Sequence, residues 1–202
     1  MTVDAVLDRV MGGHELTADE GARLFDAEGE SLDRLVRAAN DLRRRRAGDY
    51  VTYVVNRNIN FTNVCVKRCG FCAFSRGHRG EEGYFLPVEE VLRRTREAWE
   101  LGATEVCIQA GLAPRMTGSY YIDLCAAIKR EVPDIHVHAF SPEEVLYGAT
   151  LSGRSIEDYL RALKDVGLGS LPGTSAEILD DRVRDTIDRK STRLNSSHVS
   201  ES

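Results

Sequence analysis

Cys65-Val66-Lys67-Arg68-Cys69-Gly70-Phe71-Cys72 is the stretch around which this sequence is organised. Its cysteines, Cys65, Cys69 and Cys72, have CxxxCxxC spacing and can bind one metal centre from one side. Thiolates are soft ligands, which favour zinc, copper(I) or an iron–sulfur cluster. Because a four-iron four-sulfur cluster normally takes four thiolates, three cysteines would leave one iron open to another molecule. The alternative is a structural zinc site, in which His78 completes a Cys3His ligand set.

The segments around this loop alternate between strand and helix patterns. Residues 51–55 are β-branched and aromatic and predict a strand just before the loop. Periodicity, caps and breakers then predict strands at 104–108, 135–139 and 168–171, and helices at 87–101, 120–131, 155–166 and 177–187. Such alternation indicates a parallel sheet with right-handed crossovers. The expected fold class is therefore α/β, a partial TIM-type β/α barrel with about four β/α units.

Polar motifs follow the carboxyl end of every predicted strand. They are the segment 58–72, Gln109-Ala110-Gly111, Phe140-Ser141-Pro142 and Pro172-Gly173-Thr174. A β/α barrel builds its active site from the loops at this end of its strands. The sequence therefore predicts that these motifs meet the cysteine loop.

The sequence before residue 50 predicts helices, and it contains no motif typical of a catalytic or metal site. Thr17 and Glu20 have the spacing of a capping box, Ser31 is expected to cap the next helix, and Gly48 to end it. We expect three parts: an N-terminal helical segment at 1–49, half of a barrel at 50–188, and a disordered tail at 189–202. Because the tail has little apolar content and no periodicity, we interpret it as non-native and the chain as C-terminally truncated.

Composition limits the classes of partner and compartment. The 202 residues are 42% hydrophobic and 29% charged, as in a soluble globular domain. A net charge of -5 argues against nucleic acid as a partner, and no apolar stretch reaches the ~20 residues of a membrane span. Five cysteines, three of them clustered, suit a metal site in a reducing cytosol, so we expect a cytoplasmic protein.

Four further residues have both a structural and a chemical interpretation. Cys107 and Cys125 fall among apolar neighbours, and we expect both to be small core residues. His136 and His138 share one face of a predicted strand, and His138 lies nearer its carboxyl end. A hydrogen-bonded structural role is one reading of His138, and substrate binding or proton transfer is the other. Ser141 and Glu143 just beyond are expected to cap a helix.

The sequence around these motifs resembles a known family. The strings that carry the resemblance cover much of 50–187 and are residues 56–65, 70–76, 104–109, 138–145 and 170–179. They are similar to the radical S-adenosylmethionine (SAM) family, above all to its tyrosine-cleaving branch in deazaflavin biosynthesis. The menaquinone-pathway enzymes of aminofutalosine synthase and dehypoxanthine futalosine cyclase type are similar but match less closely.

The resemblance implies a cofactor site. Cys65, Cys69 and Cys72 would hold a four-iron four-sulfur cluster, with Phe71 as the aromatic residue before the last cysteine. SAM would bind the open iron, close to Phe71, Gln109 and Gly111. Ala110 stands where the family has a glycine, and its methyl group would crowd the cofactor if that position needs a positive φ.

The resemblance also implies a reaction and partners. A 5′-deoxyadenosyl radical would cleave L-tyrosine, and the 4-hydroxybenzyl group would be transferred to 5-amino-6-(D-ribitylamino)uracil, a step of coenzyme F-420 biosynthesis. An electron donor and a companion radical SAM subunit are the implied protein partners, and His138 is the candidate catalytic residue. Because half a barrel leaves two open sheet edges, we expect little tyrosine cleavage by the 202-residue chain itself.

Overall fold

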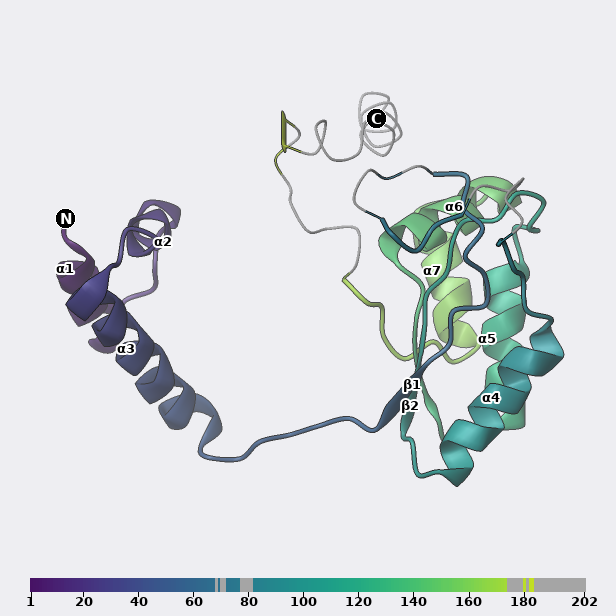
Figure 1. Cartoon of the computed structure of the whole chain (residues 1–202), viewed down its shortest axis with the longest axis horizontal. Helices are drawn as coiled ribbons and strands as arrows, with labels where there is room; N and C mark the ends of the chain where they lie inside the picture. Colours follow the sequence, from purple (N-terminus) through teal and green to yellow (C-terminus); the bar gives the residue numbers. More distant parts are fainter. Residues whose placement is uncertain (68, 70–71, 77–81, 174–179, 181, 184–202) are drawn as a thin grey trace. The chain divides into compact units, whose positions relative to one another are not determined.

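The structure is a computed structural model that describes residues 1–67, 69, 72–76, 82–173, 180 and 182–183. It divides into two units, Met1–Tyr53 and Val54–Ser202, and each is described here by itself (Figure 1). The helix expected at 177–187, apart from residues 180 and 182–183, and the tail at 189–202 lie outside the described residues, as does Phe71. No helix in the described part of the chain has the length and apolar character needed to cross a membrane.

The N-terminal unit consists of three helices, α1 (Val3–Met11), α2 (Ala18–Leu24) and α3 (Gly29–Ala47). The predicted capping box is confirmed, because the Thr17 hydroxyl accepts from the Glu20 backbone N–H and the Glu20 carboxylate accepts from the Thr17 N–H. The predicted cap at Ser31 is wrong. The N-cap of α3 is Glu28, and the Ser31 hydroxyl accepts from the Glu28 N–H at 3.0 Å.

The second unit contains an open sheet of three parallel strands in the order β1-β2-β3. The strands are β1 (Asn56–Asn58), β2 (Glu105–Ile108) and β3 (His136–Ala139). The register places Cys107 beside both Asn58 and His138. The predicted strand at 168–171 is reduced to a single bridge between Ser170 and His138.

The strand predicted at 51–55 is wrong in its position. Pairing with β2 begins only at Asn56, and Tyr53 is 84% exposed. The Val55 carbonyl accepts from the Thr104 N–H, so the chain joins the sheet just after the apolar run. Strand propensity reports how well a side chain fits a half-buried pleated surface, and these residues have no such surface in the structure.

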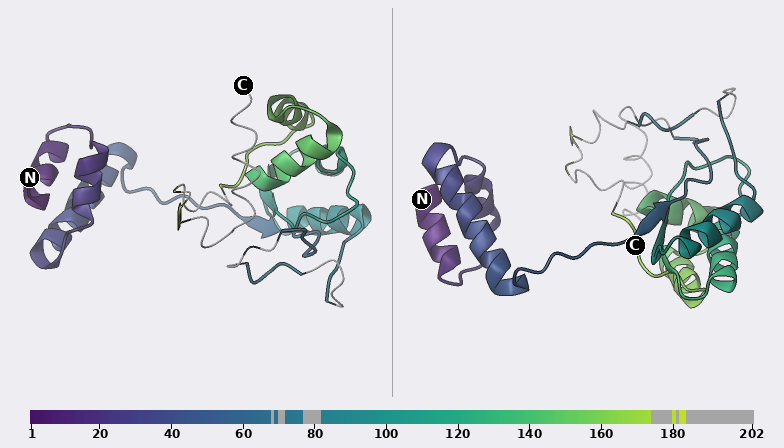
Figure 2. Two further views of the ribbon diagram at one scale, coloured as in Figure 1. Left: turned by 90° about the horizontal axis from the view of Figure 1, so that it is seen from above. Right: turned by 60° about the horizontal axis from the view of Figure 1, so that its bottom comes forward.

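Four helices follow the strands and pack on one face of the sheet (Figures 1 and 2). They are α4 (Val88–Glu100), α5 (Tyr120–Glu131), α6 (Pro142–Ser152) and α7 (Ile156–Asp165). Alternate strand residues are buried against them with no exposed surface, namely Val106, Ile108, Val137 and Ala139. Cys125 of α5 is also fully buried, as predicted.

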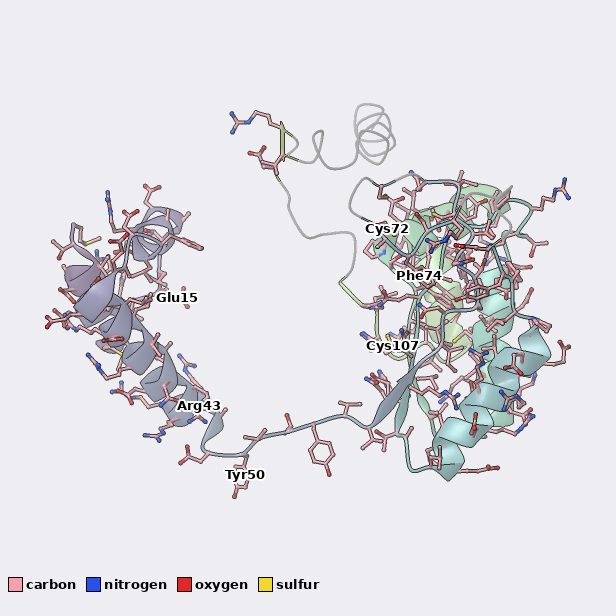
Figure 3. The ribbon with its side chains drawn as sticks, in the orientation of Figure 1. Glu15, Arg43, Tyr50, Cys72, Phe74 and Cys107 are labelled. Atoms are coloured by element: carbon pink, nitrogen blue, oxygen red, sulfur yellow. The ribbon has the colours of Figure 1, made fainter. Side chains whose placement is uncertain are left out.

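The opposite face of the sheet is polar. Because side chains alternate along a strand, Glu105, Cys107, His136 and His138 face away from the helical core. The prediction that Cys107 is a core residue is therefore wrong: it is only partly buried, and it lies on the other face from Val106 and Ile108. In Figure 3, Cys72 and Phe74 lie beyond Cys107 in the direction in which the strands end.

Helix α6 begins where a capped helix was expected, although the sequence analysis gave it no residue range. Its N-cap is Ser141, as expected, and Pro142 occupies the first turn. The partner in the capping box is Glu144, so the prediction for Glu143 is wrong. Position N3 of the helix lies three residues after the cap, and only the side chain there reaches back to the N-cap N–H.

Candidate active site

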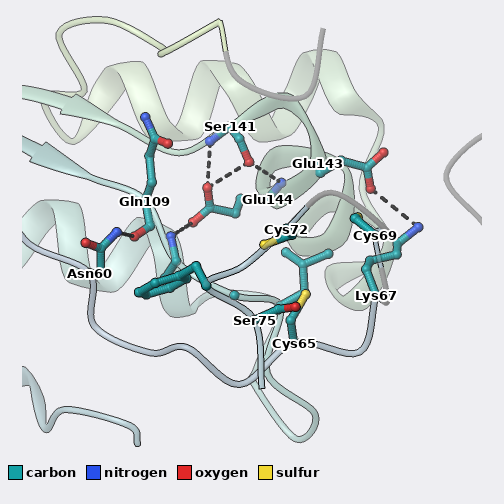
Figure 4. Close-up of a pocket in the computed structure, with 14 residues that line it drawn as sticks. Asn60, Cys65, Lys67, Cys69, Cys72, Ser75, Gln109, Ser141, Glu143 and Glu144 are labelled. Atoms are coloured by element: carbon teal, nitrogen blue, oxygen red, sulfur yellow. Dashed lines mark hydrogen bonds and ion pairs between the residues drawn. The ribbon is translucent and has the colours of Figure 1, made fainter. Parts of the chain in front are cut away.

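A cavity of about 330 Å³ lies at the carboxyl ends of the strands (Figure 4). It is lined by Asn60, Cys65, Lys67, Cys69, Cys72, Phe74, Ser75, Gln109, Ala110, Gly111, Leu112, Ser141, Glu143 and Glu144. The segments that follow β1, β2 and β3 all contribute, which confirms that three of the four predicted motifs meet. Pro172 and Gly173, from the fourth motif, are not among the lining residues.

The cysteine loop is closed at its base by backbone hydrogen bonds. The Cys65 N–H donates to the Arg76 carbonyl at 3.1 Å, and the Arg76 N–H donates to the Asn63 carbonyl at 2.7 Å. The Arg76 guanidinium donates to the Ala73 carbonyl at 3.0 Å and pairs with Glu82 at 3.0 Å. These contacts hold the two ends of the loop together, so its three cysteines return to the same cavity.

Cys65, Cys69 and Cys72 are partly buried, and all three line this cavity. The Cys72 N–H donates to the Cys69 carbonyl at 3.2 Å, which links the second and third cysteines directly. Three cysteines that line one cavity suit an iron–sulfur cluster with one iron not held by cysteine. His78, which a Cys3His zinc site would need, lies outside the described residues.

The turn after β2 packs directly against the cysteine loop. A Cβ atom at Gly111 would lie 2.3 Å from the Val64 carbonyl oxygen, so only glycine allows this approach. The Gly111 N–H donates to the Thr62 carbonyl and the Ala110 N–H donates to Glu144. Ala110 is not among the described residues with positive φ, so its methyl group is compatible with the turn.

Gln109 and Asn60 connect the ends of β1 and β2. The Asn60 amide donates to the Gln109 carbonyl at 2.5 Å, and the Gln109 amide nitrogen lies 3.8 Å from the Cys107 sulfur. Both residues line the cavity, as does Gly111. Contact of Gln109 and Gly111 with a cofactor stays a prediction.

Glu144 is a lining residue that the sequence reasoning did not identify. It is 1% exposed, and its carboxylate accepts from the Ser141 N–H at 2.7 Å, the Ser141 hydroxyl at 2.8 Å and the Ala110 N–H at 3.0 Å. Burial raises the pKa of Glu144 to about 7, although these hydrogen bonds oppose the shift. The capping-box pattern from Ser141 to Glu144 was the signal that could have identified it.

Lys67 brings a cation into the same cavity. Its ammonium group lies 3.5 Å from the Glu143 carboxylate, and the two side chains are 12% and 18% exposed. The contact is an ion pair without hydrogen-bond geometry, because the buried Lys67 nitrogen has no hydrogen-bond partner among the residues that the structure describes. A buried ammonium group whose N–H donors are not used within the described residues suits a ligand that carries a carboxylate.

His138 does not line the cavity. Its Nδ1 lies 2.7 Å from the Ser170 hydroxyl, on the sheet face that carries Cys107. The catalytic role of His138 therefore stays a prediction.

Thr62 and Asn63 are buried and bind the segment near Tyr84. The Thr62 hydroxyl donates to the Tyr84 carbonyl at 2.6 Å, and the Asn63 amide donates to the Glu82 carbonyl.

Comparison with known proteins shows which family has a similar sequence. Residues 59–195 match the family model of the radical SAM superfamily. The FO synthase of Streptomyces coelicolor is 52% identical over 170 residues, which are 84% of this chain and 20% of that protein. The 5-amino-6-(D-ribitylamino)uracil–L-tyrosine 4-hydroxyphenyl transferase of Methanopyrus kandleri is 48% identical over 186 residues, which are 91% of this chain and 49% of that protein.

Solved structures share the fold at low sequence identity. The FeFe-hydrogenase maturase HydG of Carboxydothermus hydrogenoformans has a TM-score of 0.63 at 20% identity, over 84% of this chain and 37% of that one. Methylornithine synthase has a TM-score of 0.57 at 21% identity, over 94% of this chain and 64% of that one. These similarities confirm the predicted α/β class and the partial barrel. The chain spans about half the length of the curated transferases and a fifth of the FO synthases.

Proposed function

The chain belongs to the radical SAM superfamily, and we propose that it serves the transfer of the 4-hydroxybenzyl group of L-tyrosine to 5-amino-6-(D-ribitylamino)uracil. The observation that carries the proposal is the convergence of Cys65, Cys69 and Cys72 on one cavity with the end of β2. Identity near 50% to transferases that bear this name supports the choice of substrates.

The residues present fit the cofactors that the family implies. Cys65, Cys69 and Cys72 would hold a four-iron four-sulfur cluster, and the adjoining cavity, at about 330 Å³, has the size of a small-molecule pocket. When bound, the cluster and SAM supply the one-electron chemistry that starts the reaction. Lys67 lies where it can bind the carboxylate of an amino-acid ligand, with Glu143 as its present partner.

The other residues of the cavity position these groups. Gly111 allows the end of β2 to support the cysteine loop, and Glu144 fixes the start of α6 against Ala110. Such support keeps the reacting groups in one geometry, which is how a protein directs the chemistry of a cofactor. A role of His138 on tyrosine or on the pyrimidine belongs to the same proposal.

An anaerobic assay tests the proposal. The reconstituted chain, SAM, a reductant and isotope-labelled tyrosine are incubated with 5-amino-6-(D-ribitylamino)uracil, and 5′-deoxyadenosine and the benzylated pyrimidine are measured by mass spectrometry. We expect tyrosine to increase 5′-deoxyadenosine formation above the rate without substrate, with little tyrosine cleavage and little transferred product from the 202-residue chain.

Cys72→Ala is the test variant, and Cys107→Ala is its matched control. Both remove a thiol, but only Cys72 lines the cavity, so only Cys72→Ala should abolish 5′-deoxyadenosine formation. Stimulation by a futalosine-type substrate and not by tyrosine would contradict the proposed substrates. It would instead support the menaquinone-pathway alternative.

A further inference from the structure

We propose that Glu105, His136 and His138 form a second metal site, for a divalent transition-metal ion, on the sheet face away from the helices. One ligand atom from each residue lies within 4.8 Å of the other two. None of the three residues lines the cavity of the cysteine loop. The site is therefore distinct from the proposed cluster site.

Backbone pairing places the three side chains together. His136 and His138 are two residues apart on β3, so both imidazole rings lie on one face of the sheet. Glu105 of β2 lies directly beside His136 in the parallel register. A His-x-His pair on one strand and a carboxylate on the next therefore meet without any rearrangement of the backbone.

Neighbouring groups hold the rings and the carboxylate in place. The Ser170 hydroxyl lies 2.8 Å from Nε2 of His136 and 2.7 Å from Nδ1 of His138. The ring of His136 packs on Gly169, where a Cβ atom would lie 2.3 Å from its Cε1. The Asn56 amide binds one oxygen of Glu105 at 3.4 Å, while the other lies 3.8 Å from Nε2 of His136.

The donor set has the chemistry of a transition-metal site. Two imidazoles and one carboxylate are a usual ligand set for Zn²⁺ and Fe²⁺, and three protein ligands leave positions for water or a ligand. Metal–ligand bonds of about 2.1 Å place ligand atoms roughly 3.0–3.4 Å apart. Separations of 3.8 Å and up to 4.8 Å therefore need to contract by between about 0.4 and 1.8 Å, which requires side-chain rotation.

The site is also accessible. The side chain of His136 is 44% exposed and that of Glu105 is 16% exposed, so an ion can enter from solvent. Nε2 of His136 lies 3.8 Å from the Glu105 carboxylate and also contacts the Ser170 hydroxyl at 2.8 Å, so this hydroxyl gives up the contact or becomes a further ligand when an ion binds. The inference does not depend on the substrates proposed above, because metal binding is measured without turnover.

The first test uses the cluster-loaded chain. It is dialysed anaerobically against Zn²⁺, and zinc and iron are counted per chain. We expect one zinc per chain with unchanged iron, and loss of that zinc in His138→Asn. The matched control is His14→Asn, because His14 lies 3.1 Å from Glu20 but shares that carboxylate with Arg9. His14→Asn should leave the zinc count unchanged.

The second test removes the sulfur ligands of the cysteine loop. In the Cys65→Ser/Cys69→Ser/Cys72→Ser variant, Co²⁺ should bind with visible d–d bands and without a thiolate-to-cobalt charge-transfer band. His136→Asn or His138→Asn in this background should weaken Co²⁺ binding at least tenfold, since loss of an outer hydrogen bond alone costs roughly ten- to a hundredfold.

Two results overturn the proposal. One is equal zinc in the cluster-loaded chain and its His138→Asn variant, which would make the three residues a hydrogen-bonded polar cluster only. The other is a charge-transfer band that disappears in Cys107→Ser, because the bound ion would then be held by that thiol. Fluorescence of Trp99, the only tryptophan, shows in each variant whether the second unit is folded.

Discussion

Gly111 and Val64 are in such close contact that a Cβ atom at Gly111 would lie 2.3 Å from the Val64 carbonyl oxygen. The same atom would lie 3.1 Å from the Cβ of Cys65. The end of β2 therefore supports the first cysteine of the loop through backbone contact. This relationship gives Gly111 a structural role that a sequence motif alone does not reveal.

Gly111→Ala should displace the cysteine loop, because backbone atoms and not a flexible side chain oppose the added methyl group. We expect a loss of about 1–3 kcal/mol in the free energy of unfolding of the second unit, as for other overpacked sites. Iron bound per chain after anaerobic reconstitution should fall severalfold. Urea unfolding followed by Trp99 fluorescence measures the first quantity and metal analysis the second.

Gly21→Ala is the control for this substitution. Gly21 lies in α2, and a Cβ atom there would have no heavy atom within 4 Å apart from the nearby backbone of its own helix. Its iron content should equal that of the parent chain. Equal iron in Gly111→Ala would show that the loop does not depend on the end of β2.

Glu144 should make the stability of the second unit depend on pH. The pKa of its carboxyl is about 7 in the folded chain against an ordinary value of 4.5. Between these values the folded state binds more protons than the unfolded state, so the free energy of unfolding falls as pH rises. The fall is on the order of 3 kcal/mol between pH 4.5 and 7.

Glu144→Gln should remove this pH dependence and also lower stability at pH 5. The amide presents an NH2 group to one of the N–H donors of Ser141 and Ala110, and an unsatisfied buried donor costs about 1–3 kcal/mol. Urea unfolding at pH 5 and pH 7.5 measures both effects. Glu157→Gln, at an exposed carboxyl on α7, should leave the pH dependence intact. A pH dependence that survives in Glu144→Gln would assign it to another group.

Lys67 and Glu143 should be coupled energetically. Their charged groups are 3.5 Å apart and largely buried, so Glu143→Gln leaves an ammonium without a counter-charge. We expect Glu143→Gln alone to cost more stability than the Lys67→Met/Glu143→Gln double variant. A double-mutant cycle in urea gives the coupling, which we expect to exceed about 0.5 kcal/mol. Strict additivity of the two single variants would mean that the pair does not interact.

Much of the fold follows from local signals in the sequence. Caps and breakers placed α4, α5 and α7 to within a few residues, because Pro87, Ser155 and Gly167 act through their own backbone and side chains. The strand at 51–55 was misplaced because its apolar residues suit a sheet, whereas pairing with β2 selects the polar Asn56–Asn58.

The candidate site was only partly predictable, because some of its contacts join residues that lie far apart in the sequence. Cysteine spacing identified Cys65, Cys69 and Cys72, since the ligands lie in one short loop. The role of Glu144 depends on the Ala110 N–H, and the contacts of His138 depend on Ser170, which are long-range pairings. The capping-box spacing from Ser141 does point to Glu144, so the choice of Glu143 was wrong because it did not use this local signal.

The measurement that tests the central claim most directly is electron paramagnetic resonance of the reduced, anaerobically reconstituted chain with and without SAM. Three cysteine ligands predict about four irons per chain and a spectrum that changes when SAM is added, because one iron is open to it. A spectrum that SAM leaves unchanged, or a colourless protein that retains zinc in place of iron, would contradict the claim.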